Sequence, residues 1–172
     1  MKMKMTTQRI VKTAAIAAIY VALTLAFAFM SYGNIQFRLS EVMTLFAFFD
    51  PFYIPGLTLG CLIANLLGPN GILDAVVGTI ATLISVILIA LTGVKMRQSR
   101  VGIWIASIWP TLINAVMIGI MLNKLFELPL ALTMLEVGIG EFVVITLAGV
   151  PLFKFLMKKH AILFDKLIKE KR

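Results

Sequence analysis

The sequence predicts an all-α membrane protein with six transmembrane helices and with the N- and C-termini in the cytoplasm. Three observations predict this class: the hydropathy of the chain, the spacing of its apolar runs and the positions of its basic residues. Of the 172 residues, 60% are hydrophobic and 14% are charged, and the mean hydropathy is +1.00. A soluble domain is typically about 45–50% apolar and about 25% charged. This apolar surplus excludes a soluble enzyme, a disordered chain and a nucleic-acid-binding domain with an exposed basic surface.

The basic residues fall into three clusters separated by long apolar stretches. The net charge is +8, from 16 basic and 8 acidic residues. One cluster precedes the first apolar run, a second lies at 95–100, a third closes the chain at 154–172, and only Arg38 and Lys124 lie outside them. Positive charge of this kind is typical of cytoplasmic loops. We therefore interpret it as a topology signal of a bacterial plasma-membrane protein, in preference to a surface for nucleic acid or an anionic ligand.

A helix needs about 20 apolar residues to cross a bilayer, and the chain supplies six candidates. The helices are expected over residues 10–30, 35–49, 52–67, 72–94, 101–122 and 130–157. Six spans place all three basic clusters on one side of the membrane, whereas five would separate them. The first run could pass for a signal peptide, but it exceeds the roughly 7–15 apolar residues of such a segment, so we interpret it as a retained span. The short helix 35–49 could also be re-entrant.

Several polar residues lie within or at the ends of these helices, where a charged side chain costs about 2.5–3.5 kcal/mol on insertion. They are Arg38, Glu41, Asp74, Asn114, Glu136 and Glu141. In the six-span topology they all fall in the outer half of the membrane and come from four helices, which predicts one outward-facing polar cavity. Trp104 and Asn114 share one face of the helix 101–122. A structural ion pair between Arg38 and Glu41, one helical turn apart, is an alternative interpretation.

The sequence offers little for other chemistries. The single cysteine, Cys61, lies in an apolar run and the single histidine, His160, lies in the basic tail. No disulfide framework, metal site or cofactor is therefore expected. The chain has no G-x-x-x-x-G-K-[ST] loop, so ATP-driven work would require an ATPase in another protein. It also lacks H-E-x-x-H and a second intramembrane aspartate beside Asp74, which argues against an intramembrane enzyme.

The first helix carries a stripe of small residues. Alanines recur every fourth position, at Ala14, Ala18, Ala22 and Ala26. Small side chains allow close approach of helices in lipid. This face could pack within the chain or against a partner membrane protein.

Taken together, these features resemble the substrate-binding S components of energy-coupling factor (ECF) transporters. More narrowly, two motifs are similar to the QueT family of queuosine-precursor transporters: IQFRLSE at 35–41, and PGLTLGCLIANLL at 55–67 followed by Asp74 and GTIATL at 78–83. Gly140-Glu141 in the last helix also fits. The resemblance covers nearly the whole chain and implies an S-component-like helical bundle, with residues 1–172 forming one integral membrane substrate-binding domain.

The resemblance implies a mechanism that the residues alone do not give. An S component captures a vitamin-like solute from outside and then associates with a transmembrane coupling protein (EcfT) and two ATPases (EcfA and EcfA′). Ala14, Ala18 and Ala22 would form the docking face. The solute would be a 7-deazaguanine such as preQ1 or preQ0, bound within the lipid bilayer without any cofactor.

The chemistry of a 7-deazaguanine suits carboxylates, because one carboxylate can accept both the ring N–H and the exocyclic amine. We expect Glu141 or Glu136 at that edge with Asn114 in support, and Asp74 or Glu41 at the aminomethyl cation of preQ1. The other candidate binding residues are Arg38, Asn65, Trp104 and Trp109, with either tryptophan stacking on the ring. The alternatives are an S component for another solute (a thiamine precursor, a pterin or biotin) and a self-sufficient proton-coupled transporter using Glu136 and Glu141.

Overall fold

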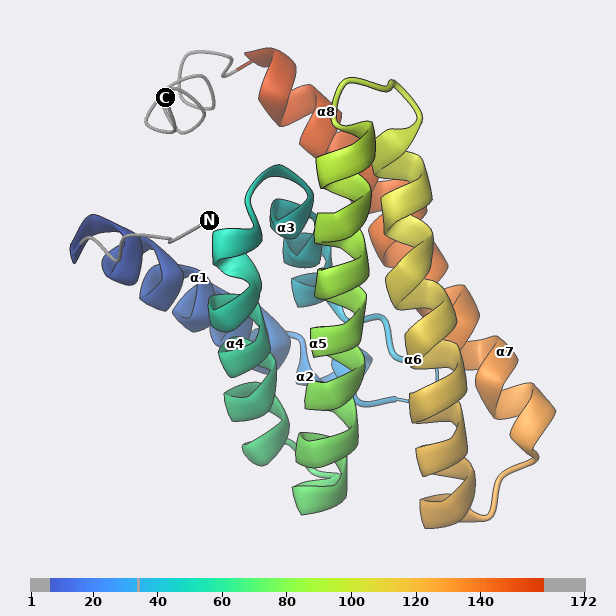
Figure 1. Ribbon diagram of the computed structural model, residues 1–172. Helices are drawn as coiled ribbons and strands as arrows, with labels where there is room; N and C mark the ends of the chain where they lie inside the picture. The colour runs from blue at the N-terminus through green and yellow to red at the C-terminus, as the bar shows by residue number, and fades with distance from the viewer. Residues whose placement is uncertain (1–6, 34, 160–172) are drawn as a thin grey trace.

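The computed structural model describes residues 7–33 and 35–159, and within these ranges the regular structure is helical (Figure 1). The elements are α1 (Thr7–Ala26), α2 (Ala28–Ser31), η1 (Leu39–Leu45), α3 (Phe46–Phe49), η2 (Pro51–Tyr53), α4 (Ile54–Leu66), α5 (Gly71–Met96), α6 (Gly102–Phe126), α7 (Leu130–Glu141), η3 (Phe142–Gly149) and α8 (Val150–Lys159). The segment η1 is a 3-10 helix. The segment η3 is a π-helix that joins α7 to α8 in one continuous helical segment. The predicted all-α class is confirmed.

The six expected helical segments are present, but they differ in length. Four are long and apolar enough to cross a membrane: Thr7–Ala26, Gly71–Met96, Gly102–Phe126 and Leu130–Leu156. The other two, Leu39–Phe49 and Pro51–Leu66, are shorter apolar helices. At about 2.0 Å per residue for its 3-10 part and about 1.5 Å for the rest, the first of these covers about two thirds of a bilayer core that is about 30 Å thick. The count of six spans therefore stays a prediction.

The second segment begins later than the sequence predicts. Helical structure was expected from residue 35 but starts at Leu39, because Gln36 has a positive φ of 49° and Arg38 is extended. The carbonyl oxygen of Ile35 lies against Gly140 of α7, where an added Cβ would come within 1.8 Å of it. The non-helical stretch 35–38 therefore brings the chain into contact with the last helix.

Helices α1 and α4 pack closely through a pair of glycines. A Cβ on Gly56 would lie 2.6 Å from the carbonyl oxygen of Thr13, and one on Gly60 would lie 3.0 Å from that of Ala17. Small residues four positions apart let membrane helices approach in this way. In Figure 1, α1 crosses obliquely against α4, whereas α5 and α6 stand side by side.

Basic residues from the described parts of the three clusters lie at one end of the bundle. The guanidinium of Arg9 lies 5.2 Å from the centre of the Phe52 ring, and Lys154 donates to the carbonyl oxygen of Arg100 at 3.3 Å. In Figure 1 the 97–101 connection and the end of α8 lie at this end, and the 67–70 and 127–129 turns lie at the other. That this end faces the cytoplasm stays a prediction.

Candidate functional site

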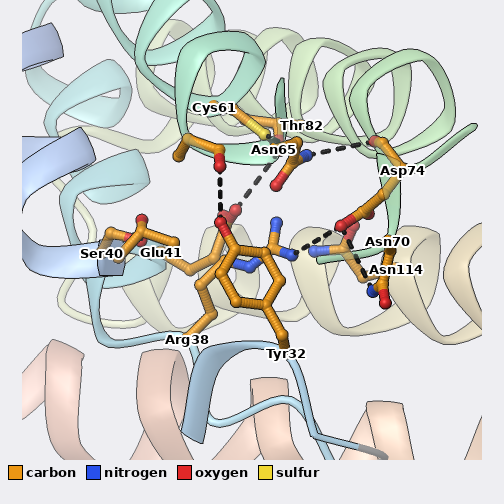
Figure 2. A network of polar contacts seen from close by, with 12 residues as sticks. Tyr32, Arg38, Ser40, Glu41, Cys61, Asn65, Asn70, Asp74, Thr82 and Asn114 are labelled. Carbon is orange, nitrogen blue, oxygen red and sulfur yellow. Dashed lines mark hydrogen bonds and ion pairs between the residues drawn. The ribbon is translucent and has the colours of Figure 1, made fainter. Parts of the chain in front are cut away.

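Four charged side chains from separate parts of the chain are buried in the interior of the bundle. Arg38 precedes η1, Glu41 belongs to η1, Asp74 lies in the first turn of α5 and Glu141 ends α7. Their exposed fractions are 3%, 0%, 0% and 2%. Because burial of a charge in an apolar protein is costly unless it is paired, these residues and their polar neighbours require a specific explanation. We use the name buried polar cluster for these four residues together with the polar side chains that contact them or one another, Tyr20, Tyr32, Cys61, Asn65, Thr82 and Asn114 (Figure 2).

Arg38 reaches across the cluster to Asp74. One terminal nitrogen of its guanidinium, Nη2, lies 3.9 Å from Asp74 Oδ2, and the guanidinium carbon lies 5.6 Å from the centre of the Tyr32 ring. Nε and Nη2 of Arg38 have no hydrogen-bond partner among the described residues. The ion pair that the structure shows for Arg38 is thus with Asp74, and not the alternative pair with Glu41. Glu41 still lies one turn from Arg38, because its main-chain N–H donates to the Arg38 carbonyl oxygen at 2.9 Å.

Glu41 is held by hydroxyl groups from two other helices. Tyr20 of α1 donates its hydroxyl to Glu41 Oε1, and Thr82 of α5 donates to the same oxygen at 3.3 Å. The second oxygen, Oε2, is buried and accepts no hydrogen bond from the described residues. One carboxylate oxygen is thus fixed by the protein, and the other has unused acceptor capacity.

Asn65 connects α4 to the start of α5. Its side-chain nitrogen donates to the main-chain oxygen of Asp74 at 3.2 Å and to the sulfur of Cys61 at 3.3 Å. Gly78 leaves the space that Asn65 occupies, because a Cβ at that position would lie 2.4 Å from Asn65 Nδ2. Oδ1 of Asn65 and Oδ1 of Asp74 remain buried without a hydrogen-bond partner in the described part of the chain.

Glu141 enters the cluster from the last helix. It accepts a hydrogen bond from Asn114 of α6 at 3.0 Å, and its Oε2 is buried without a partner within residues 7–33 and 35–159. Glu41 and Arg38 are close enough to interact with it electrostatically. The π-helix η3 begins directly after Glu141, and such wide turns often occur at functional sites.

Six of the nine predicted binding residues are therefore brought together, and three are not. The six are Arg38, Glu41, Asn65, Asp74, Asn114 and Glu141. Glu136 is half-buried and has no hydrogen bond or ion pair with the cluster. The ring of Trp104 lies 4.9 Å below the ammonium of Lys154 at the basic end of the bundle, and Trp109 donates to Thr92 at 3.0 Å. Stacking by a tryptophan stays a prediction that the geometry does not favour.

Three hydroxyl groups and one sulfur of the cluster are not among the predicted binding residues. They belong to Tyr20, Tyr32, Cys61 and Thr82. Cys61 and Thr82 both lie within the motifs of residues 55–67 and 78–83, and a joint examination of these motifs could have found them. Tyr20 could have been found from its place on the first helix, two residues from the alanines Ala18 and Ala22.

The geometry of this site makes a specific prediction for two glycines of α7. Gly140→Ala should destabilise the protein by about 1–3 kcal/mol, the usual cost of overpacking, because its Cβ would lie 1.8 Å from the Ile35 carbonyl oxygen. Gly138→Ala is the matched control, since its Cβ would meet Ala115 at an ordinary 3.4 Å. Thermal unfolding of both variants in detergent checks this, and equal midpoints would contradict the close approach of 35–38 to α7.

The cluster contains both donors and acceptors that no described residue satisfies. Unpartnered oxygens of Glu41, Asp74 and Glu141 can accept, and the guanidinium of Arg38 can donate. In the part of the chain that the structure describes, no group of three histidine, cysteine or acidic side chains could hold a metal ion. Buried ionisable residues inside membrane bundles typically belong to a substrate or ion pathway. The fold and the site thus define a multi-pass membrane protein of the transporter class.

Comparison with known proteins identifies the family. The QueT transporter family model matches residues 10–158, and the chain belongs to this family of multi-pass cell-membrane proteins. Over 83 residues it is 43% identical to the queuosine precursor transporter QueT of Lactococcus lactis subsp. cremoris. This match covers 47% of the chain and 48% of the relative, so it spans about half the length of each protein. No solved structure matches the chain.

Proposed function

We propose that the protein is the substrate-binding subunit of an ECF-type importer and that it captures a 7-deazaguanine precursor of queuosine from outside the cell. The observation that carries this proposal is the buried polar cluster, in which carboxylate oxygens of Glu41, Asp74 and Glu141 lack partners. Buried acceptors of this kind are rare in folded proteins. Family membership and the name of the Lactococcus relative support the choice of solute.

Glu141 is the best candidate for the guanine-like edge of the solute. Its Oε1 is held by Asn114 at 3.0 Å, which fixes the orientation of the carboxylate, and Oε2 is unpartnered. A carboxylate that is held in one orientation can accept two parallel hydrogen bonds from the ring N–H and the exocyclic amine. Glu136, the earlier alternative, lies outside the cluster.

The balance of charge favours a cationic solute such as preQ1. The cluster contains three carboxylates and one guanidinium, and all four groups are buried. Asp74 already has Arg38 as its partner, so Glu41 is the carboxylate best placed to receive the aminomethyl cation. A neutral analogue such as preQ0 would leave that negative charge without compensation.

Import would depend on partner proteins that bind α1. Ala14, Ala18 and Ala22 are exposed on α1; we call them the alanine face. It supplies a smooth surface on which the coupling protein EcfT could pack, with EcfA and EcfA′ hydrolysing ATP. The absence of a phosphate-binding loop from the chain agrees with this division of labour.

Ala18→Leu is expected to reduce uptake by cells at least about tenfold and to leave solute binding by the purified protein unchanged. A leucine would hold α1 away from the partner helix of EcfT at the point where small residues permit close contact. Ala131→Leu, the same substitution at an exposed position of α7, is the matched control. Radiolabelled preQ1 uptake and calorimetric binding would be measured side by side, and equal uptake by the two variants would contradict docking through the alanine face.

Reconstituted vesicles test the proposed mechanism itself. Vesicles holding the protein with its coupling module should accumulate preQ1 only when ATP is supplied on the ATPase side. Accumulation by the protein alone, driven by a proton gradient and abolished by an ionophore, would instead identify a self-sufficient proton-coupled transporter.

A further inference from the structure

Helix α1 is the element that touches both the buried polar cluster and the outside of the bundle. Tyr20 is fully buried and its hydroxyl donates to Glu41. Ala18 and Ala22 lie two residues away on either side, which places them about 200° around the helix axis from Tyr20, and both are exposed. Tyr20 and the alanine face therefore occupy opposite sides of one helix.

A second contact joins the same two segments. The hydroxyl of Thr24, one turn beyond Tyr20, lies 2.6 Å from the hydroxyl of Ser40, and it also bonds the main-chain oxygen of Tyr20 at 2.9 Å. Ser40 and Glu41 are neighbours at the start of η1. Tyr20 and Thr24 of α1 thus form hydrogen bonds with two adjacent residues of η1, Glu41 and Ser40.

A further hydrogen bond to Glu41 comes from α5, because Thr82 donates to the same oxygen as Tyr20. Its other oxygen is free to receive a solute. A solute cation bound at Oε2 would shift the Glu41 carboxylate, and this shift would displace Oε1, to which the Tyr20 hydroxyl is hydrogen-bonded. Helix α1 packs on α4 through Gly56 and Gly60, and Gly60 lies directly against Tyr20, whose Cβ would be 3.0 Å from an added Cβ.

We propose that Tyr20 is a positioning residue that transmits occupancy of the cluster from Glu41 to α1, and thereby couples solute binding to the alanine face. The docking role of that face rests on the proposed function above, whereas the link between Glu41 and α1 does not. By reciprocity of binding free energies, docking at α1 strengthens solute binding by the same factor.

Tyr20→Phe removes the hydroxyl and keeps the ring. The matched control is Tyr53→Phe, in the η2 turn, whose ring packs on Phe46 and whose hydroxyl takes no part in the cluster. Hydrogen–deuterium exchange is measured with and without preQ1 on the purified protein in detergent. In the wild type and in Tyr53→Phe, preQ1 should slow exchange at least about fivefold, the lower end of typical couplings, both in 35–45 and in α1.

In Tyr20→Phe the slowing should persist in 35–45 and disappear from α1. A purely structural role would instead change both segments together. The proposal is overturned if α1 still responds in Tyr20→Phe, or if α1 of the wild type does not respond while 35–45 does. Thr24→Val should give a partial loss of the α1 response.

Failure of the proposed function would look different, because the wild type would then not bind preQ1 at all. In that case the ligand-free proteins decide the link. Glu41→Gln should change exchange in α1 when Tyr20 is present and leave it unchanged in the Tyr20→Phe background, and equal changes in the two backgrounds would overturn the proposal.

Discussion

Glu141→Gln is expected to weaken binding of a 7-deazaguanine at least about tenfold. Hydrogen bonds to a charged group contribute about 1.5–3 kcal/mol, and about 1.4 kcal/mol corresponds to a factor of ten in affinity. The amide keeps the size of the side chain, but it cannot accept both bonds from a guanine-like edge. Isothermal titration of the purified variant with preQ1 measures the effect.

Glu136→Gln provides the control for this experiment. It is the same substitution on the same helix, five residues earlier, at a half-buried position outside the cluster. Its affinity should stay within about twofold of the wild type, as for a typical change away from a site. A loss of affinity in Glu136→Gln with none in Glu141→Gln would exchange the roles of the two carboxylates.

The second large effect is expected on stability. Arg38→Met should lower the free energy of unfolding by about 3–5 kcal/mol, because removal of one partner leaves buried carboxylate charge without compensation. Titration of the ligand-free protein with denaturing detergent in mixed micelles measures it. Arg97→Met is the control: Arg97 is exposed, donates to the Phe48 carbonyl oxygen at 3.5 Å, and should cost under about 1 kcal/mol.

A double variant separates loss of charge pairing from loss of packing. If Arg38 acts by compensating Asp74, Arg38→Met combined with Asp74→Asn should recover much of the stability that Arg38→Met loses. A double variant that is less stable than either single variant would show that the two side chains act independently.

Much of the site could be predicted because charge inside a membrane helix is expensive. Arg38, Glu41, Asp74 and Glu141 were all selected on that ground, and all four meet in the interior. Glu136 was selected on the same ground but lies elsewhere. Five residues rotate a helix by about 140°, so Glu136 and Glu141 cannot face the same side of α7.

The pairing within the cluster could not be predicted from spacing. Arg38 and Glu41 are separated by one helical turn in the sequence, but Arg38 lies in the extended stretch before η1. Its conformation depends on the contact of Ile35 with Gly140, more than 100 residues away. The rule that side chains three or four residues apart pair on a helix cannot predict a contact between residues so distant in the sequence.

The tryptophans show a similar limit. Trp104 and Asn114 do share one helical face, but ten residues separate them by about 15 Å along the axis. Trp104 lies at the basic end beside Lys154, where aromatic residues are common at membrane interfaces. The spacing of residues predicts which side of a helix they face. It does not predict which of them lies at the depth of the binding site.

Calorimetric titration of the purified protein alone, in detergent, tests the central claim most directly. The solutes are preQ1, preQ0 and queuine, with thiamine, riboflavin and biotin as controls. The buried polar cluster predicts tight one-to-one binding of a 7-deazaguanine, with preQ1 bound more strongly than preQ0, and no binding of the three vitamins. Binding of a vitamin in place of every 7-deazaguanine, or of none of the six solutes, would contradict it.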